Sequence, residues 1–163
     1  RDLRLSVFGA DLNVLDAQID QILRQIGSVL EIAFALALAD ELADLVMRGV
    51  KRALATLKRD FEKELDPLPQ IGDHLVVLDG AGTPRAIVRT THVELRHFNQ
   101  IDDEFAFDAG EGDLTLRWWL TAHRQDFAER GEREGFEVHE HIELVLEWFE
   151  VVWPPAAPAQ APA

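Results

Sequence analysis

The stretch GVKRALATLKRDF, residues 49–61, decides the fold of this chain. Its Ala, Leu, Lys and Arg residues favour a helix over residues 50–65, because these residues have high intrinsic helix propensity. In such a helix the cations would form a solvated face, with Lys58 and Glu62 paired one turn apart. The stretch also concentrates positive charge, in Lys51, Arg52, Lys58 and Arg59, directly after Arg48. Why a positive cluster lies here is the first question that the sequence raises.

The rest of the chain is strongly acidic. It holds 30 Asp and Glu against 16 Lys and Arg, which gives a formal net charge of -14. Such a charge repels a polyanion at long range and argues against non-specific binding of duplex nucleic acid. A local cationic groove can still bind a short or single-stranded nucleic acid, because salt screens each charge over about 8 Å.

Length and composition indicate one folded domain. A chain of 163 residues with 47% hydrophobic content can bury one core of ordinary size. The longest apolar run, residues 32–39, is much shorter than the roughly 20 residues of a membrane helix, so we expect no membrane partner. The absence of cysteine excludes disulfides, thiolate nucleophiles and Cys-ligated zinc. The first residues lack a secretory signal pattern, and we expect a cytoplasmic location.

The N-terminal third has a helical pattern. Apolar residues recur every three or four positions from residue 12 to residue 49, and Gly49 is a suitable stop. We therefore expect residues 1–37 to form an N-terminal helical segment packed on a domain of residues 38–154. The apolar helix over 12–47 could also form a homodimer. Pro67 and Pro69 then predict a loop over residues 66–73.

The remaining segments predict a sheet and one long helix. Strands are expected over 74–78 and 86–95, joined by a hairpin turn at 79–82, and over 141–153. Asp113 can cap a helix over 114–133, and Gly135 can end it. Residues 155–163, rich in Pro and Ala, predict a disordered tail. Trp118 and Trp119 lie about 100° apart on the helix, so one of them should be partly exposed.

Several short motifs occur in a characteristic order: LADEL at 38–42, GVKRA at 49–53, PLPQIGD at 67–73, VVLDG at 76–80, RTTHVE at 89–94, GEGD at 110–113, WW at 118–119 with AH at 122–123, and FEVVW at 149–153. Their order and spacing resemble the ASCH family of the PUA-like superfamily, small β-barrels associated with RNA. The resemblance covers about residues 38–154. It implies an α+β fold, a small mixed or antiparallel β-barrel with flanking helices. It also implies that residues 51–57 form a barrel strand, against their helix propensity.

The resemblance also implies a site. In relatives that act as small amidohydrolases on acetylated cytidine, a lysine, a threonine and a distant glutamate form the proposed catalytic group. Lys51 matches the lysine and Glu111 matches the acid, but the threonine falls on Leu54, which has no hydroxyl. The nearest hydroxyl, on Thr56, is about 7 Å further along a strand. The polar Phe-Gly-Asp-Ser-Pro turn of the family is also replaced, by apolar residues 32–36.

These departures disfavour covalent amidohydrolysis and favour a divergent or inactive member of the family, or one with another ligand. The resemblance implies a cleft between Lys51/Arg52 and the Glu111 loop that binds RNA or a nucleotide-like ligand. Lys51 and Arg52 would contact phosphate, Trp118 would stack on a base, and Glu111 with Asp113 would accept hydrogen bonds. Two alternatives stay open: a hydrolase, either a metal-assisted ribonuclease or an amidohydrolase of modified nucleosides, and a catalytically inactive dimeric interaction domain.

Two further patterns carry less weight. His139 and His141 would project to one side of a strand, but the sequence places no third ligand beside them, so we expect no metal and no cofactor. His123 lies near the Trp119 face of the predicted helix and is expected to pack or to form a hydrogen bond rather than to act as a general base.

Overall fold

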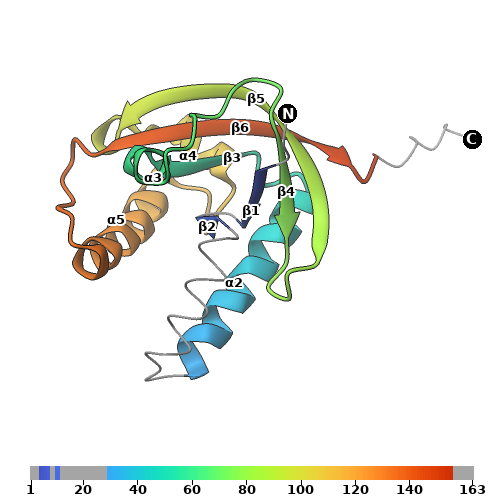
Figure 1. The fold of residues 1–163 in the computed structure, drawn as a ribbon, viewed down its shortest axis with the longest axis horizontal. Coiled ribbons are helices and arrows are strands. Elements are labelled where there is room, and N and C mark those ends of the chain that lie inside the picture. Colours follow the sequence, from blue (N-terminus) through green and yellow to red (C-terminus); the bar gives the residue numbers. More distant parts are fainter. Residues whose placement is uncertain (1–3, 8–9, 12–28, 156–163) are drawn as a thin grey trace, which may run out of the picture.

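The computed structural model describes residues 4–7, 10–11 and 29–155 and has the expected α+β architecture (Figure 1). One curled sheet has the strand order β2-β1-β4-β5-β6-β3. Its strands are β1 (Arg4–Val7), β2 (Ala10–Asp11), β3 (Ala53–Leu57), β4 (His74–Leu78), β5 (Pro84–His97) and β6 (Glu143–Trp153). The helices are α2 (Val29–Met47), α3 (Lys58–Glu64), α4 (Asp103–Ala109) and α5 (Leu116–Glu134), with a short 3-10 turn η1 (Phe98–Gln100). Strand β1 runs parallel to β4, and the other neighbouring strands are antiparallel.

The deciding stretch splits into a strand and a helix. Strand β3 pairs with β6 from Ala53↔Trp148 to Leu57↔Leu144, and helix α3 begins at Lys58. The predicted strand is therefore confirmed over residues 53–57, and the helix expected from propensity forms only beyond it. Ala53 and Leu57 are completely buried. Pairing with β6 and burial outweigh the local helix preference, as tertiary context often does.

Among the described residues, the two larger apolar clusters lie one on each side of β3 and β6, and a smaller third one contains Val76 and Leu78. The first lies between these strands and the helices α4 and α5, and it contains the aromatic side chains Phe98, Phe105, Trp119 and Phe127. The second lies inside the curl of the sheet, where α2 covers β4 and β5; it contains Ala43, Val46, Leu54, Leu75, Val77, Ala86, Val88 and Phe149. The segment around residues 50–52 passes between the two clusters, because it joins α2 to β3.

The N-terminal prediction was partly wrong. Residues 4–7 and 10–11 are strands rather than part of a helical segment. Strand β1 pairs with β4 and β2 pairs with β1, and this pairing satisfies backbone groups of both strands. Helix α2 crosses the expected boundary at residues 37 and 38 without a break. It ends at Met47, and Gly49 follows with φ +70°, as the stop signal predicted. Predictions for residues 12–28 and for the tail beyond residue 155 lie outside the described residues.

The other predicted elements form with shifted ends. The hairpin turn is present, with Asp79 accepting hydrogen bonds from the backbone of Ala81 and Thr83. Helix α5 ends at Glu134 with Gly135 as its C-cap, as predicted, but its N-cap is Thr115 rather than Asp113. Strand β6 begins only at Glu143, so His139 and His141 lie in the turn before it. Among the described residues, no three His, Cys, Asp or Glu side chains are grouped to hold a metal ion. No described helix is long and apolar enough to cross a membrane.

Candidate functional site

Lys51 lies between α2 and β3 and is only 2% exposed. Its Nζ donates to the backbone oxygens of Ala53 (3.0 Å) and Ala109 (3.2 Å) and to Oε1 of Glu111 (2.5 Å). An ammonium group has three N–H donors, and these three acceptors match them. A buried charge needs such partners, because its desolvation costs several kcal/mol by order of magnitude. The structure therefore brings together Lys51 and Glu111, two of the residues that the sequence predicted for the site.

Gly110 allows this contact. It ends α4 with φ +70°, and a Cβ at this position would lie 2.3 Å from the oxygen of Val50 and 2.6 Å from Cα of Lys51. No other residue fits this close approach, because both neighbours are backbone atoms and the left-handed conformation favours glycine. Because residue 110 is a glycine, the end of α4 can lie directly against the backbone of Lys51. The next residue, Glu111, then contacts the ammonium group of Lys51.

His123 of α5 is the third ionisable group at this point. Its Nε2 lies 4.0 Å from Oε2 of Glu111, while Nδ1 lies 3.0 Å from the oxygen of Trp119. Its ring stacks on Trp119 at 3.9 Å between centroids. The packing role that the sequence predicted is thus confirmed. Its approach to Glu111 was not predicted, because it depends on how α5 docks against the Glu111 loop.

The electrostatics of the pair follow from burial and charge. Burial by itself raises the pKa of Glu111, but the positive charge of Lys51, helped by His123 and by the Lys51 hydrogen bond, leaves that pKa below its ordinary value. Burial lowers the pKa of His123, against the opposing charge of Glu111. The carboxyl of Glu111 is therefore ionised at neutral pH, and burial disfavours the imidazolium form of His123.

Arg52 does not join this cluster. Its guanidinium, 49% exposed, pairs with Oδ1 of Asp108 at 2.6 Å, and Oδ2 of Asp108 accepts from the indole of Trp148 at 3.0 Å. Lys58 pairs with Glu143 (2.7 Å) and Arg59 with Glu134 (2.9 Å). The cations of residues 49–61 are thus distributed among acids from four different parts of the fold. This pairing explains the positive cluster, and it means that Lys51 and Arg52 do not act as one positive surface.

The loop after Gly110 carries the other predicted residues. Trp118, in the first turn of α5, is 37% exposed, and the Cα of Gly112 lies against its indole ring. Trp119 is buried, so the prediction that one of the two is exposed is confirmed. Asp113 accepts hydrogen bonds from the backbone N–H and the hydroxyl of Thr115, which is itself the N-cap of α5. Asp113 therefore stabilises the N-terminal end of α5 by fixing its N-cap residue.

The ASCH domain profile matches residues 31–153. This chain belongs to the ASCH domain family. Two solved structures resemble it: an ASCH domain from Lactobacillus crispatus JV V101 (39% identity, 68% of this chain, 69% of that chain, TM-score 0.64) and a protein from Enterococcus faecalis V583 (33% identity, 69% of this chain, 68% of that chain, TM-score 0.64). None of the curated proteins matches the chain.

Within this ASCH domain, Leu54 lies where the amidohydrolase relatives carry a threonine. The leucine is buried, in the apolar cluster inside the curled sheet. Its burial in that cluster explains why a leucine is tolerated there, and the position supplies no nucleophile.

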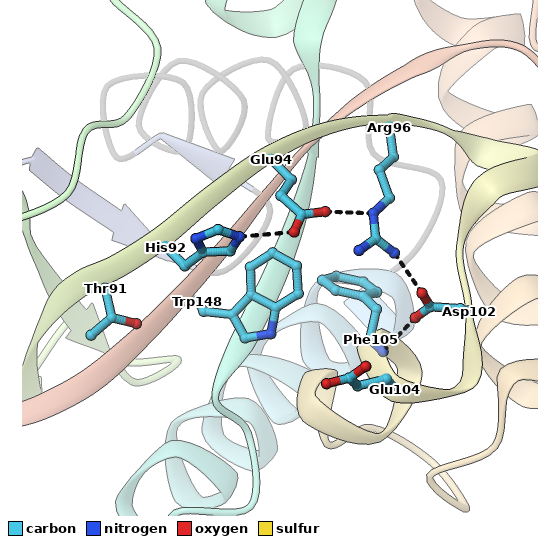
Figure 2. Close-up of a pocket in the computed structure, with 8 residues that line it drawn as sticks. All are labelled: Thr91, His92, Glu94, Arg96, Asp102, Glu104, Phe105 and Trp148. Atoms are coloured by element: carbon cyan, nitrogen blue, oxygen red, sulfur yellow. Dashed lines mark hydrogen bonds and ion pairs between the residues drawn. The ribbon is translucent and has the colours of Figure 1, made fainter.

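The ASCH domain also has a hollow of about 330 Å³ outside the Glu111 loop, between β5, β6 and the start of α4 (Figure 2). It is lined by Thr91, His92, Glu94, Arg96, Asp102, Glu104, Phe105 and Trp148. Thr91, His92 and Glu94 belong to the RTTHVE motif, but the sequence assigned no site to them. The available signal was the polar repeat His92, Glu94, Arg96, whose spacing of two places all three on one face of a strand.

Proposed function

We propose that this ASCH domain binds RNA or a nucleotide-like ligand at the Glu111 loop, which we define as residues 110–113 with Trp118. One observation carries the proposal. A carboxylate held ionised by a buried lysine at 2.5 Å lies in the same short loop as a glycine that supports a partly exposed indole. The indole offers a stacking surface for a base, and the carboxylate offers an acceptor for the amino groups of that base.

The structure changes the role that we assign to Lys51. Its three N–H groups are directed to Glu111 and to two backbone oxygens, so it fixes the carboxylate instead of contacting phosphate. Arg52 is the better phosphate ligand, because half of its side chain is exposed and its fork can contact a phosphate beside Asp108. Asp113 supports the proposed site by holding Thr115 at the start of α5.

Binding is favoured over hydrolysis by two features of the cluster. A general base is most effective when its pKa lies near the working pH, and Lys51 moves the pKa of Glu111 away from that range. The position of the family's threonine is occupied by the buried Leu54, which cannot attack a carbonyl. The cluster is thus better suited to recognition than to catalysis.

The test uses two matched pairs of exposed residues. Trp118→Leu removes the proposed stacking surface, and Trp153→Leu is its control at a 49% exposed indole of β6. Arg52→Ala removes the proposed phosphate contact, and Arg89→Ala is its control, since Arg89 is 50% exposed and pairs with one acid, Glu150. We expect Trp118→Leu to weaken binding of labelled single-stranded RNA about tenfold at low salt, measured by fluorescence anisotropy. Arg52→Ala should weaken it less, and the controls should not change it.

Equal effects in each pair, or no saturable binding by the unaltered chain, would refute the proposal. Incubation of the same RNA with and without manganese, and of acetylated nucleosides, tests the hydrolase alternative. Turnover that disappears in Glu111→Gln would establish an enzyme in place of a binding domain.

A further inference from the structure

The hollow beside Trp148 is a second candidate site, separate from the Glu111 loop (Figure 2). Its volume of about 330 Å³ is large enough for a small ligand or one side chain of a partner. Its residues come from β5, from the N-cap and first turn of α4, which follow β5 closely in the chain, and from the distant strand β6. The proposed function of the Glu111 loop uses none of them.

A β-bulge shapes one wall of this hollow. The register between β5 and β6 shifts between Thr90 and His92, so Thr91 is the extra residue. Thr90 is buried and donates to the carboxylate of Glu147, while Thr91 and His92 line the hollow. Bulges of this kind redirect side chains, often beside a functional site. Here the bulge starts the polar row His92, Glu94, Arg96.

The charged side chains of the hollow are fixed by a chain of contacts. His92 Nε2 lies 2.8 Å from Oε1 of Glu94, Arg96 Nε donates to Oε2 of Glu94 at 2.6 Å, and Arg96 Nη1 donates to Oδ2 of Asp102 at 2.8 Å. The hydrogen bonds from His92 and Arg96 lower the pKa of Glu94, and the backbone N–H of Phe105 together with Arg96 lowers that of Asp102. Both groups are carboxylates at neutral pH, and the single guanidinium of Arg96 is shared between them.

The remaining lining adds one more acid and an aromatic wall. Glu104 brings a third carboxylate, so acids exceed the guanidinium of Arg96 by two. The indole of Trp148 is held by its hydrogen bond to Asp108 and packs against His92 (5.2 Å) and edge-on against Phe105 (5.3 Å). A fixed indole beside an excess of negative charge attracts a cation, both through the ring and through the carboxylates.

We propose that this hollow binds a planar organic cation, an amidinium or guanidinium group, with its plane against Trp148 and its charge directed to Glu104. The excess of carboxylates repels an anion. A purely apolar ligand would desolvate charged groups without compensating them. A bare metal ion is disfavoured, because no described group of three ligating side chains is placed to hold one.

The probe is benzamidine, compared with its neutral isostere benzamide and with benzoate. We expect benzamidinium to bind saturably to the full chain and to shift the indole Nε1–H resonance of Trp148 in NMR spectra, assigned with a Trp148→Phe variant. Benzamide should bind at least about tenfold more weakly, because it is neutral and cannot form a charge-assisted hydrogen bond with Glu104. Benzoate should not shift that resonance.

Glu104→Gln keeps the shape of the hollow and removes one charge. It should weaken benzamidinium binding several-fold, while Glu132→Gln, the same change at an exposed position of α5, should not. Similar losses in both variants would show that only the overall acidity of the chain attracts the probe, and would overturn the proposal. Equal affinity for benzamidine and benzamide would overturn it as well. Glu104 is exposed, so this test does not depend on whether Trp148→Phe folds.

Discussion

Lys51 and Glu111 form an ion pair in which each side chain neutralises the charge of the other. The ammonium is enclosed by Glu111 and two backbone oxygens, and removing it leaves a mostly buried carboxylate without its main partner. Breaking such a pair from one side is costly, whereas replacing both partners with neutral groups of similar size is tolerated much better. The pair therefore fixes how the Glu111 loop docks on Lys51, but it adds little to the free energy of unfolding compared with a neutral pair of similar size.

We expect Lys51→Met to lower the free energy of unfolding by about 3–5 kcal/mol, because it leaves the Glu111 carboxylate unpaired. The double variant with Lys51→Met and Glu111→Gln should recover most of the loss. Urea unfolding followed by circular dichroism measures both. If the double variant is as unstable as the single one, the loss comes from packing around Lys51 and not from the unpaired charge.

At the scale of elements, the end of helix α4 lies in close backbone contact with residues 50–52, which lead into strand β3. Gly110 at the end of α4 touches the backbone of residues 50 and 51, and the backbone N–H of Arg52 donates to the oxygen of Asp108 at 2.8 Å. The same end of α4 carries Asp108, which accepts from the indole N–H of Trp148, and leads into the Glu111 loop. The position of α4 is thus important for both proposed sites.

Gly110→Ala tests this contact against a matched control. Gly49 has the same φ of +70°, but a Cβ there would meet nothing within 4 Å, whereas at Gly110 it would meet backbone. Gly49→Ala should therefore cost only the left-handed conformation, about 1–2 kcal/mol. Gly110→Ala should cost clearly more and should also weaken RNA binding, measured by thermal unfolding and fluorescence anisotropy. Equal losses of stability would mean that α4 can shift away from β3 without cost.

For the whole molecule, the pKa shifts predict how stability changes with pH. Burial lowers the pKa of His123, so stability should begin to fall as the pH drops through its unfolded value of about 6.5. Glu111, Asp102 and Glu134 have lowered pKa values in the fold. Their contribution is present above the unfolded pKa of about 4 and is lost as the pH falls through the folded values. The carboxyl of Asp126, whose pKa is raised by partial desolvation, acts in the opposite sense.

We therefore expect two phases when the unfolding free energy is measured in urea from pH 8 to pH 3. The first begins near pH 6.5 and should disappear in His123→Gln, while the second, at lower pH, should remain in that variant. A first phase of unchanged size in His123→Gln would show that another group is responsible.

A homodimer stays a prediction at this scale, and sedimentation velocity of the full chain tests it.

Much of the architecture was predictable from the sequence, for reasons visible in particular segments. The alternating strand patterns, the hairpin at residues 79–82 and the glycine after α5 depend on local backbone and side-chain preferences, so the sequence alone determined them. The ordered motifs also indicated the family, and the resemblance placed Lys51 and the Glu111 loop at one cleft, but it did not predict their direct contact. The sequence shows how many cations residues 49–61 contain, but it does not show which acid each of them pairs with.

Only the tertiary structure decided the features that depend on distant pairing. Residues 53–57 became a strand because β6 offered them hydrogen bonds and a buried face, although their own propensity favours a helix. Arg52 turned to Asp108 and Lys51 to Glu111 because α4 docks between them, and the hollow at Trp148 formed because a bulge in β5 meets the start of α4. The two ion pairs join residues 60 and 56 positions apart, and the β3–β6 pairs join residues still more distant in sequence. No local pattern in the chain encodes which of many acids a cation will reach.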